Sequence, residues 1–249
     1  METKMQLRIL GCGTIIQTES YYSCSGYLID DALLFDCGPG IWRTLHKNRQ
    51  LPLKISHIFL SHFHVDHCSD LAPILQERYL NDPHGEQTLK IAGPAGLKKW
   101  YHNLTSFLGE WAAGIPVILF EMGIKPVRLG AYRLSALPTG HTQNSLCYRL
   151  EKNSTCFFYS GDTDENENVI SLANGCDLAL LEASYPEEER QPGHLTPASA
   201  ARIARRAGAG KLCLTHMYPQ VRSAHPETEA SRIFPGEVFL AADGLQIDL

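Results

Sequence analysis

Short apolar runs separated by polar turns recur along the N-terminal part of the chain. Residues 6–10 form one run, and residues 27–29 and 32–35 flank an Asp-Asp pair, which is typical of a hairpin. Residues 41–47 follow a Gly-Pro-Gly turn and predict a helix, and the run 55–60 predicts a buried strand. This part of the chain is therefore predicted to be rich in strands.

Helical and extended patterns alternate through the rest of the chain. Helices are predicted at residues 71–80, 95–108, 169–173, 197–207 and 227–234. Strands are predicted at residues 90–92, 117–120, 131–137, 145–150, 155–159, 178–181, 211–214 and 238–240. No low-complexity segment, linker or internal repeat interrupts them, which favours one domain over residues 1–249. Counting elements alone supports only a mixed α and β fold.

Three imidazoles and a carboxylate gather in residues 61–67, SHFHVDH, directly after a predicted strand. Alternate residues of an extended segment point the same way, so His62 and His64 can bind one ion together. Asp66 and His67 follow the turn and can bind a second ion beside the first. Nitrogen and carboxylate ligands without a thiolate suit zinc, manganese or iron(II). The alternative is a histidine-rich surface loop, which would need neither this order nor matching ligands elsewhere.

Matching ligands follow three later strands of the chain. They are His141, Asp162 and His216, and each comes shortly after the end of a short apolar run. Two packed sheets present such positions to one shared edge. We therefore expect these three side chains to meet the cluster of residues 61–67.

Taken together, these motifs resemble the metallo-β-lactamase superfamily of metallohydrolases, and the resemblance covers nearly the whole chain. It implies an α+β fold with four layers, helix, sheet, sheet and helix, and a metal site along one edge of the β-sandwich. It also implies two divalent metal ions, with Zn2+ favoured and Mn2+ or Fe2+ as alternatives. The implied ligands are His62, His64 and His141 for one ion, Asp66, His67 and His216 for the other, and Asp162 as the bridge.

The branch of the superfamily is indicated by further residues. Members that reduce oxygen or nitric oxide usually carry a glutamate where His64 stands, so a hydrolytic site is favoured. Residues 193–197, GHLTP, resemble the ribonuclease Z branch, whose phosphodiesterases carry a histidine-x-threonine element before the last metal ligand. There Glu182 would orient His194, a pair suited to protonating a leaving oxygen. The resemblance thus gives Asp66, His194 and Glu182 as catalytic residues.

One region departs from ribonuclease Z. True members insert a long basic arm that grips tRNA between the ligands equivalent to His141 and Asp162. Here two predicted strands and their turn fill nearly all of residues 142–161, and the acidic run 187–189 flanks the site. We therefore expect a small or short phosphodiester, attacked by a hydroxide that bridges the ions, in preference to structured RNA.

Other readings of these residues remain open. A thioester or lactone hydrolase would use the same metal ligands but would not need His194. Separately, the alternative for His194 is an exposed loop histidine without a catalytic role. Ribonuclease Z itself is a second alternative. A non-catalytic metal-dependent sensor is a third, although a sensor need not retain all seven ligands.

Charge and cysteine content indicate which partners and which cellular location to expect. The net charge of −5 provides no general basic field to attract nucleic acid. No apolar stretch is long enough to span a membrane, and no C-x-x-C pair occurs among the eight cysteines. We expect a cytoplasmic protein without a membrane partner. The oligomeric state is left open, with a homodimer as one alternative.

Overall fold

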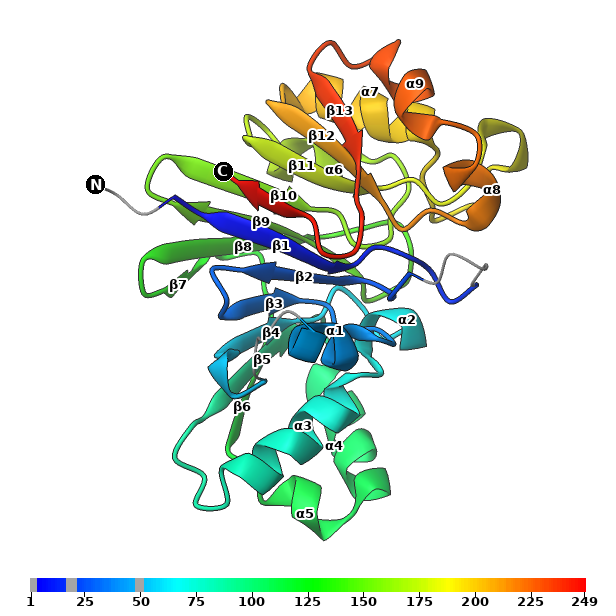
Figure 1. The fold of residues 1–249 in the computed structure, drawn as a ribbon. Helices are drawn as coiled ribbons and strands as arrows, with labels where there is room; N and C mark the ends of the chain where they lie inside the picture. Colours follow the sequence, from blue (N-terminus) through cyan, green and yellow to red (C-terminus); the bar gives the residue numbers. More distant parts are fainter. Residues whose placement is uncertain (1–3, 17–21, 48–51) are drawn as a thin grey trace.

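The strands of the protein form two sheets in this computed structural model, which describes residues 4–16, 22–47 and 52–249. The first sheet comprises β1 (Gln6–Gly11), β2 (Gly26–Ile29), β3 (Leu33–Phe35), β4 (His57–Phe59), β5 (Leu89–Gly93), β6 (Val117–Glu121) and β14 (Gln246–Asp248). The second comprises β7 (Val127–Leu129), β8 (Tyr132–Pro138), β9 (Leu146–Lys152), β10 (Thr155–Tyr159), β11 (Leu178–Glu182), β12 (Lys211–Thr215) and β13 (Glu237–Leu240). The strand orders are β14-β1-β2-β3-β4-β5-β6 and β13-β12-β11-β10-β9-β8-β7 (Figure 1).

Helices cover the outer faces of both sheets (Figure 1). Those beside the first sheet are α1 (Ile41–Lys47), α2 (Val65–Cys68), α3 (Leu71–Asn81), α4 (Leu97–Leu108) and α5 (Glu110–Ala113). Those beside the second are α6 (Glu167–Leu172), α7 (Pro197–Ala207), α8 (Pro219–Arg222) and α9 (Pro226–Ser231). Two short 3-10 helices, η1 and η2, span Pro52–Lys54 and Glu187–Glu189. None of the helices in the described ranges is long and apolar enough to cross a membrane. The helix-sheet-sheet-helix order is the predicted four-layer α+β architecture.

Apolar side chains fill the space between the two sheets. Tyr27 and Phe35 from the first sheet pack against Phe157 and Tyr159 from the second, and all four are buried. The rings of Phe35 and Phe157 meet edge to face, with centroids 5.7 Å apart, a favoured arrangement for aromatic pairs. This contact holds the sheets face to face and so fixes the edge at which their strands end.

Parallel pairing brings the ends of several strands to that edge. β10, β11 and β12 run parallel to one another, and β3 runs parallel to β4. Buried parallel strands read as continuous apolar runs, and all five residues of β11 are buried. The segments that follow β4, β10 and β12 carry the histidines and aspartates of interest, so the topology gathers them.

The structure differs from the predicted elements in places. The pattern predicts a loop over residues 61–67, whereas Val65–Cys68 form the single helical turn α2, which places Asp66 and His67 on adjacent helical positions. The pattern also does not predict β7, β14, α5 and α8, each of which spans three or four residues. By contrast, α1, α7 and β10 have the predicted bounds.

Candidate metal centre

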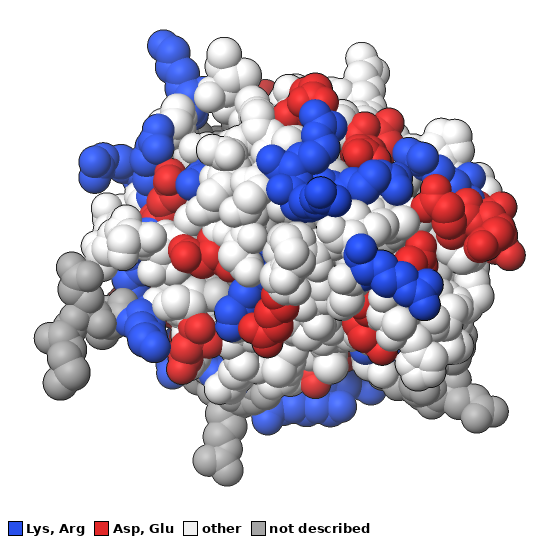
Figure 2. All heavy atoms as spheres, turned by 90° about the horizontal axis from the view of Figure 1, so that it is seen from above, with Lys and Arg blue, Asp and Glu red and all other residues white. Residues whose placement is uncertain are grey.

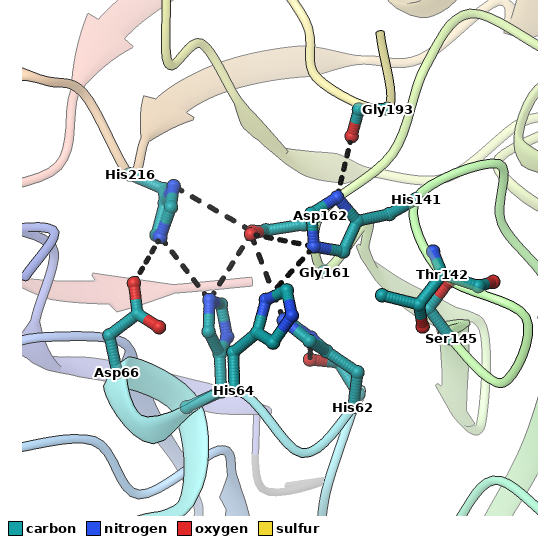
Figure 3. A network of polar contacts seen from close by, with 12 residues as sticks. His62, His64, Asp66, His141, Thr142, Ser145, Gly161, Asp162, Gly193 and His216 are labelled. Carbon is teal, nitrogen blue, oxygen red and sulfur yellow. Dashed lines mark hydrogen bonds and ion pairs between the residues drawn. The ribbon is translucent and has the colours of Figure 1, made fainter.

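The seven side chains proposed as metal ligands meet at one edge of the sandwich. All of them except His67 are labelled in Figure 3. They fall into two groups, and within each group the nitrogen and oxygen atoms that could bind a metal ion lie within 4.8 Å of one another. The first group is His62, His64, His141 and Asp162, and the second is Asp66, His67 and His216.

In the first group, imidazole nitrogens converge on one point. Nε2 of His141 lies 3.1 Å from Nδ1 of His64 and 3.7 Å from Oδ2 of Asp162. Nε2 of His62 lies 3.9 Å from the same oxygen and is buried with no hydrogen-bond partner among the described residues. A buried nitrogen is costly without a partner, so this convergence fits a shared cation.

In the second group, the contacts are equally close. Nε2 of His216 lies 3.2 Å from Nε2 of His67 and 3.4 Å from Oδ2 of Asp66. Asp162 reaches this group with its other oxygen, because Oδ1 lies 3.3 Å from Nε2 of His67. Asp162 therefore stands between the two groups, with one carboxylate oxygen toward each.

In four of the five histidines of the centre, Nδ1 contacts a polar group outside the cluster of candidate ligands. Such contacts fix the ring and leave the inward nitrogen available to a metal ion. The partners are Ser61 Oγ for His62 at 3.0 Å, Asp36 Oδ2 for His67 at 2.8 Å, Gly193 O for His141 at 3.0 Å and Ser184 Oγ for His216 at 3.0 Å.

Asp36 is a residue of this centre that the sequence pattern does not reveal. It is buried at the end of β3, and its oxygens accept from the backbone N–H and the hydroxyl of Ser61, both at 2.7 Å, and from the hydroxyl of Tyr159 at 2.6 Å. The pattern predicts only the end of a hairpin there. The available signal is that Asp36, like the candidate ligands, directly follows an apolar strand.

The pKa shifts keep two of the imidazoles neutral and Asp162 ionised, whereas for His67 burial is outweighed by the charge of Asp162, which raises the pKa. Burial lowers the pKa of His62 and of His141, so their lone pairs are free. Burial alone would raise the pKa of Asp162, but the charges of His216 and His67 outweigh it and hold that pKa well below its usual value. Neutral imidazoles and ionised carboxylates are the forms that bind divalent metal ions. The donor set, nitrogen and oxygen without sulfur, fits zinc, manganese or iron(II).

The Glu182–His194 pair lies beside the first group. Nδ1 of His194 is 3.1 and 3.2 Å from the two carboxylate oxygens of Glu182 and 4.0 Å from Oδ2 of Asp162. Glu182 is buried at the end of β11 and also accepts from the backbone N–H of Thr163 at 2.8 Å. Burial would lower the pKa of His194, but the hydrogen bond and charge of Glu182 raise it. The pair thus favours a protonated imidazole.

The segment that carries His194 is fixed at both sides. Gly193 has a φ of +78°, and a Cβ there would lie 3.2 Å from Nδ1 of His141, so a glycine suits this close approach. Thr196 caps α7 by accepting from the backbone N–H of Ser199 at 3.2 Å, in a capping box. The GHLTP motif therefore supplies a carbonyl to His141 and holds His194 in place.

Among the described residues, segments near the centre carry acidic side chains or basic side chains paired with acidic ones. Residues 142–161 contain only β9, β10 and short connections. The acidic residues Glu187–Glu189 are exposed in the loop that leads to His194. Arg202 and Arg206 on α7 pair with Glu165 and Glu167 at 3.0 and 2.7 Å, and basic and acidic side chains lie interspersed on the face seen in Figure 2.

Comparisons with known proteins agree with this arrangement. Residues 32–217 match the family described as the β-lactamase superfamily domain. The chain is 28% identical to the probable metallo-hydrolase YhfI of Bacillus subtilis, covering 96% of this chain and 98% of that protein. The crystal structure of YhfI has a TM-score of 0.87 over the full length of both chains, at 26% identity. Ribonuclease Z of Methanothermobacter thermautotrophicus is 25% identical, covering 93% of this chain and 92% of the relative.

Proposed function

The chain belongs to the β-lactamase superfamily and is a metal-dependent hydrolase, and from that premise we propose that it is a phosphodiesterase acting on small or short phosphodiesters. The observation that carries this proposal is the Glu182–His194 pair beside Asp162. A histidine held by a buried carboxylate can protonate an alkoxide leaving group. A phosphodiester of an ordinary alcohol has such a leaving group.

The proposed cofactor is a pair of divalent ions, with zinc favoured. The first group would hold one ion, the second group the other, and Asp162 would serve both. Bound there, divalent ions supply Lewis acidity to the phosphoryl oxygens and lower the pKa of an attacking water toward neutrality.

Residues of the chain itself would perform the remaining catalytic roles. Nδ1 of His194 faces Glu182, so its Nε2 would give a proton to the leaving oxygen. Asp66 is held in its ionised form, because contacts with His216 and His67 outweigh the effect of burial and lower its pKa. We assign Asp66 the role of orienting the attacking water by accepting a hydrogen bond from it.

The proposed substrate is small because the described part of the chain has no arm between His141 and Asp162 to bind a long polyanion. Residues 142–161 form only two strands with their connections, and Glu187–Glu189 would repel phosphates near His194. Similarity to a relative named ribonuclease Z supports phosphodiester chemistry and keeps tRNA 3′ processing as the second candidate. We also propose that residues 1–249 form one domain of this type.

A direct assay separates the candidate reactions. Metal-loaded protein is given a chromogenic phosphodiester, a thioester and a lactone under identical conditions, and kcat/KM is measured for each. We expect the phosphodiester to be the best substrate. An Asp162→Ala variant, prepared in the same way, should lose this activity and so assign it to the metal centre. Faster turnover of the thioester or lactone would refute the phosphodiesterase proposal.

A further inference from the structure

The inner face of the first sheet is partly exposed at its β6 edge. Residues that pair in register in a parallel sheet point to the same face, and alternate residues share that face. One face of β4, β5 and β6 carries Phe59 and Ala92, which belong to the core between the two sheets, so this is the inner face. The inward-facing residues of these strands are His57, Phe59, Lys90, Ala92, Ile118 and Phe120.

Part of this face lines an open groove. Ile118 and Phe120 are 45% and 49% exposed, which is unusual for apolar side chains on the inner face of a sandwich. They lie opposite Val127 and Leu129 of β7, the edge strand of the second sheet, across a cavity of about 250 Å³. None of the candidate metal ligands lines this cavity.

The polar groups of the groove favour an anion. Nε2 of His57 is buried without a hydrogen-bond partner, although Nδ1 of the same ring lies 2.9 Å from Oγ of Ser56. Lys90 and Arg128 line the same cavity, and among the described residues neither has an ion pair and no acidic side chain lines the cavity. A cation and an unpartnered imidazole nitrogen at the end of an apolar groove complement a carboxylate with an aliphatic tail.

We propose that this groove binds a small amphipathic anion, an aliphatic carboxylate whose tail packs on Ile118 and Phe120 and whose head contacts Lys90 and His57. The size of the proposed ligand follows from the volume of the cavity. A cavity of about 150 Å³ holds benzene, so one of this size holds roughly ten non-hydrogen atoms. Octanoate has that number and is the probe of choice. This binding site is separate from the proposed phosphodiesterase centre.

Calorimetric titration of the metal-loaded protein tests the proposal. Octanoate should bind with one site per chain. Octanol, which lacks the charge, should bind about tenfold more weakly or worse. Butanoate, which lacks four methylene groups, should bind roughly 100-fold more weakly. Equal affinity for octanoate and butanoate would contradict the predicted packing of the tail.

Matched variants locate the site. Phe120→Asp should abolish octanoate binding, because it removes apolar area and places a charged carboxylate beside the aliphatic tail of the ligand. Phe107→Asp is the control, since Phe107 is 88% exposed at the end of α4 and lies outside the groove. Lys90→Met should weaken binding about tenfold, and Lys98→Met on α4 should not. Hydrolase activity should be unchanged in all four variants.

Three results would overturn the proposal. One is no detectable octanoate binding. Another is binding that survives Phe120→Asp but is lost in Asp162→Ala, which would assign the carboxylate to the metal centre. The third is a dimer in sedimentation experiments that Phe120→Asp converts to a monomer, which would show that a second copy of the chain covers this face.

Discussion

Nδ1 of His67 lies 2.8 Å from Oδ2 of Asp36, and both side chains are buried. The carboxylate fixes the imidazole so that Nε2 faces His216 and Asp162. Outer partners of this kind orient metal ligands and increase their basicity. Asp36 therefore acts on the proposed metal centre without touching its interior.

Asp36→Asn should weaken metal retention about 10- to 100-fold, because an amide cannot accept from all the donors that converge on Asp36. The measurement is competition against a chelator of known affinity. Tyr159→Phe is the control, since it removes one of those donors and leaves the contact between Asp36 and His67 intact. Unchanged metal affinity in Asp36→Asn would show that Asp36 has only a structural role.

The predicted elements that match the structure depend on local signals. β10 is a short run of apolar and aromatic residues, and its predicted bounds are the observed ones. α7 begins at Pro197 after the Thr196 cap and ends before Gly208, which has a left-handed φ of +62°. Caps of this kind are visible in the sequence, so both ends of the helix are predictable.

The features that escaped prediction depend on distant parts of the chain. β14 is a three-residue strand that pairs with β1, so that Gln6 lies opposite Asp248 from the other end of the sequence. Asp36 contacts His67 only because β3 and β4 are neighbours. No local periodicity encodes such contacts, whereas the histidines of the SHFHVDH segment are recognisable by their spacing.

Asp162→Ala should loosen both metal ions, since each oxygen of Asp162 faces one group of ligands. Asp66→Ala should loosen only the ion of the second group. Elemental analysis after gel filtration gives the metal content per chain for each variant and for the unchanged protein. If well-loaded protein never exceeded one ion per chain, the proposal of two ions would be wrong.

His194→Ala should impair turnover in a way that depends on the leaving group. A nitrophenolate departs without a proton, so its ester should be little affected. A phosphodiester of an alkyl alcohol needs the proton, and kcat should fall roughly 100- to 10,000-fold. His102→Ala, on the exposed side of α4, is the control. Equal losses on both esters would make His194 a binding or structural residue.

A pH-dependent contribution to stability is expected at Asp30, far from the metal centre. Burial alone would raise the pKa of Asp30, but hydrogen bonds from Lys152 and Tyr132 lower it. A carboxyl whose folded-state pKa is lowered stabilises the protein above its unfolded pKa, near 4, and loses that contribution as the pH falls through the folded value.

Asp30→Asn should therefore lower the free energy of unfolding by about 1 kcal/mol at pH 7, and the difference should shrink as the pH falls below about 4. Urea unfolding of metal-stripped protein at several pH values measures this. Asp31→Asn is a matched control, because Asp31 also has a positive φ and its partner Arg8 is 3.7 Å away. If the difference in the free energy of unfolding between Asp30→Asn and the unchanged protein persisted at low pH, the charge of Asp30 would not be its cause.

We propose that this metal centre hydrolyses small phosphodiesters in preference to structured RNA. The most direct test compares kcat/KM for a cyclic or dinucleotide phosphodiester with kcat/KM for precursor tRNA, at roughly 50 and 200 mM salt. The proposal predicts equal or better efficiency on the small diesters, with little dependence on salt. Efficient, position-specific cleavage at the tRNA 3′ end, falling steeply as salt rises, would contradict it and identify tRNA processing as the function.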